Sequence, residues 1–450
     1  MGFLTKHLSS DHIFTGFNQI SKSVNGFATL LLVPIFISPE EQGYWFTFSG
    51  LAALVMLADL GFSNLILQLS AHEFAHLHFD KDRIIKGDER YLKRLSTLFT
   101  FTLRWITTIV LLSVPVILFI GYCLFSFRNT EVYWFIPWII FVIGAAMTFV
   151  NNVILYFFEG CDSVGIVQRM RSVIVIFMTL TMCVTLVLKL GLLALSVSVL
   201  ASAILGSILI LKEFSPAISG FIEESKTFSH QWGGEVIPLF WRYAVSWASG
   251  YFIFQMYTPV MFHFHGPVEA GKIGISITLW MGIFSISNVW VSAVTPKLNM
   301  LVSKKEWMAR DNLFSKNLIL SCITFMASAA MVFLLIFLLK GKVAIVDKFV
   351  DTTSMSFLAA AWFLQIIVNT LAIYLRAYKE EPLVIPSFLS ALYIVITTLL
   401  CVKFLPPKYF FLGFLSSYLW GVPWVISIFY QKRKTESHNR WVFKMGSYLR

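Results

Sequence analysis

A stripe of polar residues runs through the first long apolar segment of this chain. Thr15, Asn18, Lys22, Asn25 and Thr29 follow one another at intervals of three and four residues. On a helix this spacing places all five on one face. Because an ammonium group is costly inside a bilayer, it usually faces a wet cavity or a partner. The stripe therefore predicts a hydrated cavity, with helix–helix hydrogen bonding as the alternative.

An acidic residue lies at matching depth in the second apolar segment. Lys22 precedes Pro39 by 17 residues, and Asp59 follows Gly43 by 16. Both are therefore roughly 25 Å below the outer surface at about 1.5 Å per residue. The two side chains could form an ion pair, which would be either structural or functional.

Three further polar residues could complete the same site. Ser285 and Asn288 belong to a second polar stripe, in which helix–helix hydrogen bonding is the favoured interpretation. Arg242 precedes Pro267 by 25 residues, roughly 37 Å along a helix, so we expect it at the inner interface as a cavity mouth or an anchor. Cations near the inner end of a cavity suit an anionic headgroup such as a diphosphate.

The sequence His72-Glu73-Phe74-Ala75-His76 matches a zinc-binding pattern. On a helix both imidazoles would share a face, with Glu73 as the general base of a metalloprotease. No third ligand is evident, and the five cysteines have no metal-binding spacing. An intramembrane zinc metalloprotease is thus an alternative, while our main expectation is that the chain has no metal and no cofactor.

The composition places the whole chain in a membrane. Hydrophobic residues make up 57% and charged residues 13%, whereas a soluble domain carries about a quarter charged residues. Crossing a bilayer takes about 20 apolar residues. Twelve such runs occur, at about 15–38, 43–69, 98–125, 135–158, 172–190, 193–212, 237–263, 273–295, 317–339, 353–375, 383–403 and 409–430.

The segments between these runs are short, and their charge indicates the orientation. None is large enough to bury a core of its own, so the function must lie among the spans or at their ends. We expect no nucleic-acid partner. Most of the 35 Lys and Arg residues lie at the termini and in the loops on the same side of the membrane, which predicts that both termini are cytoplasmic. The basic segments Lys81–Arg94 and Lys432–Arg450 either contact membrane lipids or simply set the topology.

Two halves of the chain carry matching motifs. Pro39-Glu40-Glu41-Gln42-Gly43 and Pro267-Val268-Glu269-Ala270-Gly271 share the pattern P-x-E-x-G, 228 residues apart. Asn151 and Tyr156 in the fourth span match Asn369 and Tyr374 in the tenth. Internal repeats of this kind indicate a transporter with its site between the repeats. We therefore expect an N-terminal lobe at 1–212, a cytoplasmic linker at 213–236, a C-terminal lobe at 237–430 and a basic tail at 431–450.

Several segments also resemble one known family. The stretch from Leu57 to Phe74, LADLGFSNLILQLSAHEF, is similar to the second span of bacterial O-antigen and polysaccharide flippases. These belong to the multidrug/oligosaccharidyl-lipid/polysaccharide exporter superfamily. The turn Glu41-Gln42-Gly43-Tyr44, the segment Phe158-Glu159-Gly160 and the stretch from Asn369 to Arg376 also resemble this family.

The resemblance implies an all-α polytopic membrane protein with 12 transmembrane helices in two six-helix lobes around a central cleft. It implies a flippase in the bacterial cytoplasmic (inner) membrane. The substrate would be an O-antigen-type oligosaccharide on polyprenyl diphosphate, moved from the inner to the outer leaflet by alternating access. The other partners would be a proton or sodium ion as coupling ion and a polysaccharide polymerase.

The expected substrate-binding residues combine the stripes with the resemblance. The polar face of the first span lines the cleft, and Asp59 lies nearby as a candidate coupling acid. Two other interpretations remain: a drug or cation exporter of the same superfamily, and a polysaccharide polymerase or ligase, which would need a sizeable outer domain. The predicted site consists of Lys22, Asn18, Asn25, Asp59, Arg242, Ser285 and Asn288.

Overall fold

The chain is almost entirely helical in its computed structural model. The structure describes residues 2–448 except 81, 129–130, 344 and 379–381. Side chains are described outside residues 2–13, 55–58, 238–239, 242–243, 296, 303 and 435–448. The backbone forms two compact units, Met1–Tyr251 with Gln255–Gly274, and Phe252–Phe254 with Ile275–Arg450.

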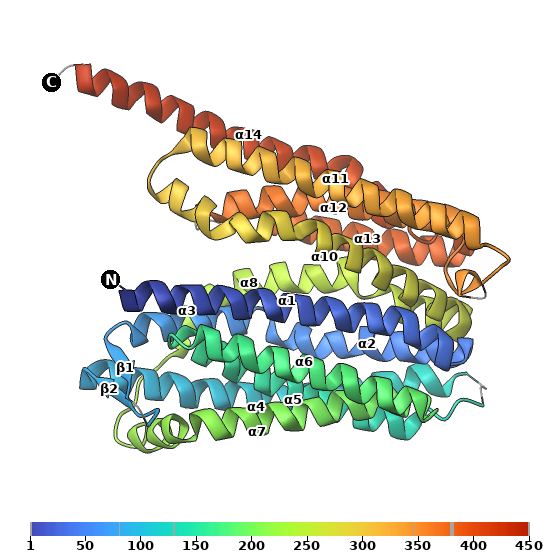
Figure 1. The fold of residues 1–450 in the computed structure, drawn as a ribbon, viewed down its shortest axis with the longest axis horizontal. Coiled ribbons are helices and arrows are strands. Elements are labelled where there is room, and N and C mark those ends of the chain that lie inside the picture. Colours follow the sequence, from blue (N-terminus) through green and yellow to red (C-terminus); the bar gives the residue numbers. More distant parts are fainter. Residues whose placement is uncertain (1, 81, 129–130, 344, 379–381, 449–450) are drawn as a thin grey trace. The chain divides into compact units, whose positions relative to one another are not determined.

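Unit 1, the first of these, is a bundle of long helices with a small β-hairpin (Figure 1). Helix α1 packs along α6, α5 packs against α7 and α3, and α6 packs against α7. Its elements are α1 (Gly2–Phe36), α2 (Pro39–Asp59), α3 (Phe62–Phe74), β1 (Leu77–Phe79), β2 (Ile85–Gly87), α4 (Glu89–Ser126), α5 (Phe135–Gly160), α6 (Val164–Val187), α7 (Leu193–Glu224), α8 (Gly233–Phe254) and α9 (Tyr257–His265). Of α8, unit 1 contains the part up to Tyr251.

Unit 2, the second, contains most of α10 and all later helices. Helix α12 packs against both α11 and α14, and α13 packs along α14. Its elements are α10 (Pro267–Ser303), α11 (Trp307–Leu339), a 3-10 turn (Val346–Lys348), α12 (Thr352–Arg376), α13 (Val384–Phe404), a second 3-10 turn (Pro407–Tyr409) and α14 (Leu412–Tyr448).

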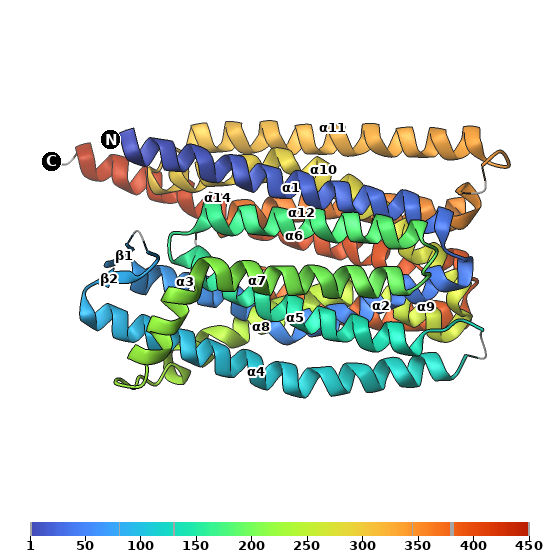
Figure 2. The same ribbon diagram turned by 60° about the horizontal axis from the view of Figure 1, so that its bottom comes forward.

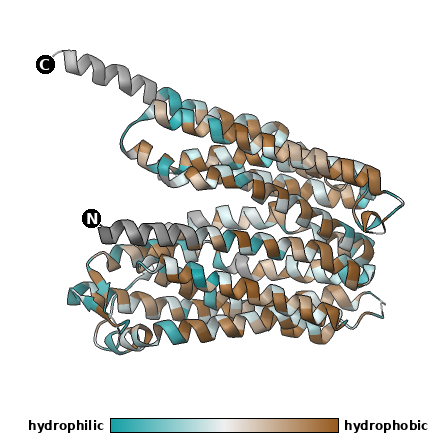
Figure 3. Ribbon diagram, in the orientation of Figure 1, coloured by the Kyte–Doolittle hydropathy of each residue, from teal (hydrophilic) through white to brown (hydrophobic). Residues whose placement is uncertain are grey.

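These helices confirm the polytopic all-α fold with twelve spans in two lobes. Among the described residues, nine helices are long and apolar enough to cross a membrane. The other three predicted spans correspond to α1, α2 with α3, and α8 with α9. Figure 3 shows apolar residues along the helices and hydrophilic ones concentrated in the hairpin and loops. The chain is therefore a multi-pass membrane protein.

Two predicted spans are broken rather than continuous. The run at 43–69 divides because Leu60 and Gly61 adopt positive φ values of 46° and 80°, a left-handed conformation that no helix can continue through. The run at 237–263 divides at Gln255 and Met256, and Pro259 lies in the first turn of α9. A proline there costs no helical hydrogen bond, because first-turn N–H groups have no partner within the helix.

The boundary between the units also differs in position from the predicted lobe boundary. Most of α8 and all of α9 group with unit 1, although the sequence repeat assigns this span to the second half. Helix α7 continues to Glu224 and α8 begins at Gly233, so most of the predicted linker at 213–236 is helical. The lobe ranges based on the repeat stay a prediction.

The two P-x-E-x-G motifs fold alike and touch one another within unit 1. Pro39 and Pro267 each begin a helix, α2 and α10, where a proline is well tolerated. Added Cβ atoms show how close the backbones are: one on Gly43 would overlap the Pro267 carbonyl, and one on Gly271 would lie 3.1 Å from the Gly43 nitrogen. Only glycine permits this backbone approach.

The hairpin β1–β2 is antiparallel, with Leu77 opposite Gly87. Figures 1 and 2 show it at the end of unit 1 where α3 ends and α4 begins. Arg83, in its turn, forms an ion pair with Glu213 of α7 at 2.8 Å. A hydrogen bond to the Asp80 carboxylate raises the pKa of the exposed Lys86 ammonium. The Arg83–Glu213 pair therefore attaches the hairpin to α7, and the Lys86–Asp80 contact lies within the hairpin itself.

The glycine contact gives a test of packing. Replacing Gly43 with Ala forces a Cβ against backbone atoms that cannot rotate away, so we expect a loss of about 1–3 kcal/mol and a lower apparent Tm in detergent. Gly26→Ala is the matched control, because nothing lies within 4 Å of its added Cβ. Equal melting temperatures for the two variants would contradict the close contact.

Candidate functional site

The polar face of α1 packs against α6 through hydrogen bonds. Asn18 Nδ2 donates to Gln168 Oε1 at 2.7 Å. Asn25 Oδ1 accepts from Thr179 Oγ1 at 2.9 Å. Asn18 and Asn25 therefore connect two helices, as the alternative interpretation of the stripe predicted, and substrate binding by these two residues stays a prediction. A buried polar pair of this kind is stable because each partner removes an unsatisfied group from the apolar interior.

Lys22 differs from its neighbours on the stripe because its side chain is exposed. The apolar exposed surface of α1 includes Ile20 and Val24, which are 62% and 55% exposed. Lys22 is two residues from each, and two residues correspond to about 200° around a helix of 3.6 residues per turn. A membrane lipid would pack against this apolar surface. The Lys22 ammonium therefore lies on the opposite side of α1.

An acid on α5 is the centre of the polar cluster beside Lys22. Glu159 Oε2 lies 2.8 Å from Arg171 Nη1 of α6, and the two side chains are 14% and 13% exposed. Glu159 Oε1 accepts from Gln168 Nε2 at 2.8 Å. Lys22 interacts electrostatically with both Glu159 and Arg171. We call Asn18, Lys22, Glu159, Gln168 and Arg171 the α1–α5–α6 cluster.

This cluster carries more positive than negative charge. Lys22 and Arg171 supply two cations, and Glu159 supplies one anion. Among the described residues, Arg171 Nη2 and Asn18 Oδ1 are buried without a hydrogen-bond partner. A free guanidinium donor in an apolar setting is a strong hydrogen-bond donor to an oxyanion. The cluster can therefore accept an anionic oxygen beside Lys22.

Sequence reasoning missed three members of the cluster. Arg171 was placed just outside the fifth span, predicted to begin at 172, whereas α6 begins at Val164. Gln168 and Arg171 are three residues apart and thus on one face of α6. Glu159 was noted only as part of the family resemblance. The i, i+3 spacing of the two α6 residues was the available signal.

Tyr156 and Tyr374, the two tyrosines of the repeat, each pack a ring against an arginine. The Arg171 guanidinium lies 4.5 Å from the ring centroid of Tyr156. In unit 2, the Arg310 guanidinium lies 4.6 Å from the ring centroid of Tyr374. Both distances suit a cation–π interaction. The two matching tyrosines therefore stabilise a buried or half-buried cation in each unit.

Asp59 is not paired with Lys22. Its Oδ1 accepts from the backbone N and the Oγ of Ser63, at 3.0 and 2.7 Å. No ion pair between described side chains joins Asp59 to Lys22, whose charged neighbours are Arg171 and Glu159. Equal depth along two helices was therefore insufficient, because α2 ends at Asp59 and the carboxylate binds the first turn of α3 instead.

The other predicted site residues lie elsewhere. Arg242 is in α8, but its side chain lies outside the described residues. Ser285 and Asn288 are in α10 within unit 2. Asn288 Oδ1 accepts from Asn369 Nδ2 of α12 at 2.9 Å, so one role of this residue is helix–helix packing. Substrate binding by these three stays a prediction.

The zinc pattern does not form a metal site in the structure. Helix α3 ends at Phe74, so His76 lies beyond it and stacks on Tyr91 at 4.1 Å. Glu73 is buried and accepts two hydrogen bonds from Arg94 Nε, each 3.0 Å. No group of three or more His, Cys, Asp or Glu among the described residues could hold a metal ion. The metalloprotease interpretation fails because the helix ends before both imidazoles can share a face.

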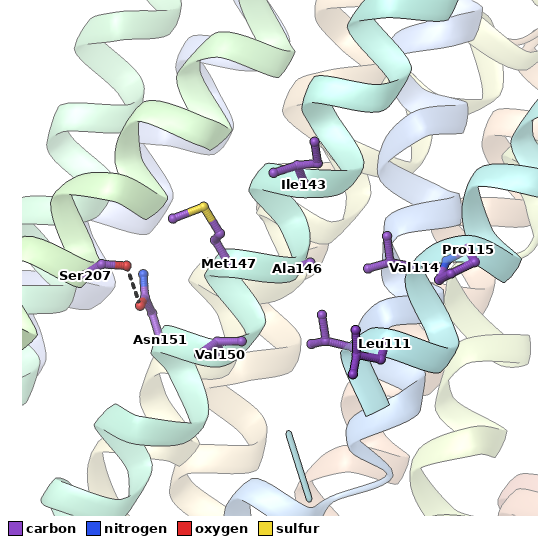
Figure 4. A pocket seen from close by; sticks show the side chains of 10 residues that line it. Leu111, Val114, Pro115, Ile143, Ala146, Met147, Val150, Asn151 and Ser207 are labelled. Carbon is purple, nitrogen blue, oxygen red and sulfur yellow. Dashed lines mark hydrogen bonds between the residues drawn. The ribbon is translucent and has the colours of Figure 1, made fainter. Parts of the chain in front are cut away.

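An apolar pocket in unit 1 is separate from the cluster. It has a volume of about 430 Å³ and lies between α4, α5 and α7. Figure 4 shows Leu111, Val114 and Ile143 around it, with the hydrogen bond from Ser207 Oγ to Asn151 Oδ1 at one side. Leu111 is 68% exposed, so this pocket opens on the apolar surface of α4, and its lining residues carry no charge.

Comparison with known proteins identifies the fold. No protein-family model and no curated protein matches the sequence. Among solved structures, an inward-facing MATE multidrug resistance transporter of the MOP superfamily has a TM-score of 0.57 at 14% identity, covering 93% of this chain and 96% of that one. The outward-facing form of such a transporter gives 0.57 at 13%, covering 95% and 96%.

A third solved structure extends the comparison. The MATE multidrug transporter DinF-BH, solved as a complex, has a TM-score of 0.61 at 12% identity, covering 95% of this chain and 96% of that one. Identities this low establish the fold alone. The chain is therefore a multi-pass membrane protein with the fold of MATE-family transporters.

The cluster predicts a particular order of stability effects. Glu159→Ala leaves Arg171 without its ion-pair partner, and breaking a buried pair costs roughly 3–5 kcal/mol. Lys22→Ala removes an exposed side chain and should change the apparent Tm little. Thermal unfolding in detergent measures both. A larger Tm loss for Lys22→Ala than for Glu159→Ala would contradict the geometry.

The zinc pattern gives a second test. We expect Glu73→Gln to lower the apparent Tm, since Arg94 then loses a buried carboxylate, while His72→Ala has little effect because its side chain is 80% exposed. Elemental analysis should find no stoichiometric zinc in the purified wild type. Stoichiometric zinc that is lost in both variants would restore the metal hypothesis.

Proposed function

We propose that the protein is a flippase for a polyprenyl-diphosphate-linked oligosaccharide. It would move the molecule from the inner to the outer leaflet of a bacterial cytoplasmic membrane by alternating access. The supporting observation is the α1–α5–α6 cluster, in which Lys22 and Arg171 outnumber Glu159. A diphosphate is an oxyanion that such a pair of cations can bind.

The position of Lys22 supports a role in binding. Its ammonium is exposed and lies away from the apolar surface of α1. Arg171 lies beside it on α6, and the Tyr156 ring holds the guanidinium in place. The diphosphate would therefore contact Lys22 first, with Arg171 as the second cation.

The energy source belongs to the proposal as well. A proton or sodium gradient could drive the cycle, and Asp59 is the predicted coupling acid. Its two hydrogen bonds from Ser63 also give Asp59 a structural role at the start of α3. The distribution of Lys and Arg along the chain supports cytoplasmic termini.

Export of drugs is the second candidate. The solved neighbours include multidrug transporters. The excess of cations in the cluster argues against a cationic substrate, because like charges brought together in an apolar setting repel strongly. The two candidates therefore differ in the charge of the substrate they predict.

Transport by purified protein tests the proposal. We expect Lys22→Ala to slow translocation of a fluorescent polyprenyl-diphosphate oligosaccharide in proteoliposomes by about tenfold or more, which corresponds to about 1.4 kcal/mol. Lys22→Arg, which keeps the charge, should retain part of the activity. Translocation is measured as the fraction of label that an outside enzyme can reach.

Ser23→Ala is the matched control. Ser23 is next to Lys22 on α1 but bonds only to the backbone of its own helix, at Gln19, so its loss should leave the rate unchanged. An unaltered rate for a folded Lys22→Ala variant would refute the proposed site. Transport of a cationic dye without transport of the lipid-linked sugar would favour the drug exporter.

A further inference from the structure

A second pocket lies inside unit 2, between three helices. It has a volume of about 220 Å³, and α11, α12 and α14 all line it. Helix α12 packs against both of the others (Figure 1) and contributes Ile367 and Leu371 to the lining. Phe314, Leu318, Ile367, Leu371 and Phe429 supply most of its apolar wall.

The polarity of this pocket changes in the same direction along two of the helices. On α11, Asp311 is followed after three and seven residues by Phe314 and Leu318. On α14, Arg433 is preceded by Phe429. Charged groups therefore form one end of the pocket, and aliphatic and aromatic groups form the other. An elongated molecule with a charged head and an apolar tail matches this arrangement.

The charged end is lined by one acid and one base, Asp311 and Arg433, and a second arginine packs against the acid. Asp311 is the carboxylate shared by two guanidinium groups, with Arg310 Nη2 at 2.8 Å and Arg433 Nη2 at 2.7 Å. Arg310 is 1% exposed and lies under the rings of Trp307 and Tyr374, at 4.7 and 4.6 Å. The buried Arg310 guanidinium holds the Asp311 carboxylate through the ion pair. Arg433 is 44% exposed, so it is the cation that a ligand reaches first.

Two further cations adjoin Arg433 on α14, namely Lys432 and Lys434. The described charges that line or adjoin this end, Arg310, Asp311 and these three α14 residues, thus sum to a positive value. The topology proposed above places this end at the cytoplasmic surface. The inner leaflet of a membrane presents anionic headgroups there, which nearby Lys and Arg side chains attract.

The pocket opens on the side of unit 2. Ser315 of α11 and Tyr430 of α14 both line it and are exposed, Tyr430 to 62%. An acyl chain in the bilayer can therefore enter the pocket from the side, between these two helices.

We propose that this pocket binds one anionic glycerophospholipid of the cytoplasmic leaflet, such as phosphatidylglycerol. The phosphate diester contacts Arg433, and one acyl chain lies against Phe314, Leu371 and Phe429. Charge complementarity selects an anionic lipid over a zwitterionic one. The site is distinct from the α1–α5–α6 cluster, which lies in unit 1.

Native mass spectrometry of the full chain in detergent tests this site. Phosphatidylglycerol and phosphatidylcholine with identical acyl chains are titrated in parallel. The wild type should bind one phosphatidylglycerol about tenfold more tightly than phosphatidylcholine. Arg433→Gln should lose most of that preference, and Lys434→Gln should lose part of it.

A second variant tests the apolar part of the site. Ser315 lines the pocket and is exposed, so Ser315→Phe can fill the space without disturbing the core. It should weaken binding of both lipids. Arg169→Gln is the matched control, because it removes an exposed cation in unit 1 and should leave the preference intact.

Four results with the two lipids would overturn the proposal, and a fifth comes from competition. These are equal binding of the two lipids by the wild type, an unchanged preference in Arg433→Gln, full binding in Ser315→Phe, and an equal loss in Arg169→Gln. Complete displacement of phosphatidylglycerol by an equimolar polyprenyl phosphate would also contradict it, because the occupant would then be a substrate-like lipid.

Discussion

The cost of placing charge inside a membrane is the constraint on which this structure depends. An unpaired ion there costs several kcal/mol, and a pair is tolerated only when hydrogen bonds complete it. In unit 1, Glu159 accepts from Gln168 and pairs with Arg171, and among the described residues Arg171 Nη2 is left as a donor without a hydrogen-bond partner. The same acid joins α5 to α6, and Gln168 extends the connection to α1 through Asn18. The same side chains therefore balance the buried charge and join the three helices.

The cost of burying charge inside the protein applies in unit 2 as well. Arg310 is almost fully buried, and its charge is balanced by Asp311 and by the faces of Trp307 and Tyr374. The two units thus each place a cation against a tyrosine at equivalent positions of the repeat, although the arginines come from different helices. Both halves of the repeat therefore have a tyrosine at the same position of the matching helix, whereas the arginine that packs on it comes from α6 in unit 1 and from α11 in unit 2.

Polar residues at helix ends perform a different task. Arg94 connects Glu73 of α3 to Glu235 of α8, and its guanidinium lies 4.9 Å from the Trp232 ring. A sequence pattern typical of zinc enzymes here belongs to an ion pair that secures helix ends. The chemistry available to Glu73 is decided by Arg94, which is 21 residues away in the chain.

The sequence by itself determined the number and order of the spans, because apolar runs of about 20 residues have no other stable environment. It also located Lys22 and the repeated P-x-E-x-G motifs. Tertiary structure alone decided that α2 ends at Asp59, that Arg171 and Glu159 lie beside Lys22, and that Gly43 touches Pro267. Hydropathy records which residues prefer lipid, but it is the rotation and packing of neighbouring helices that choose each polar side chain's partner.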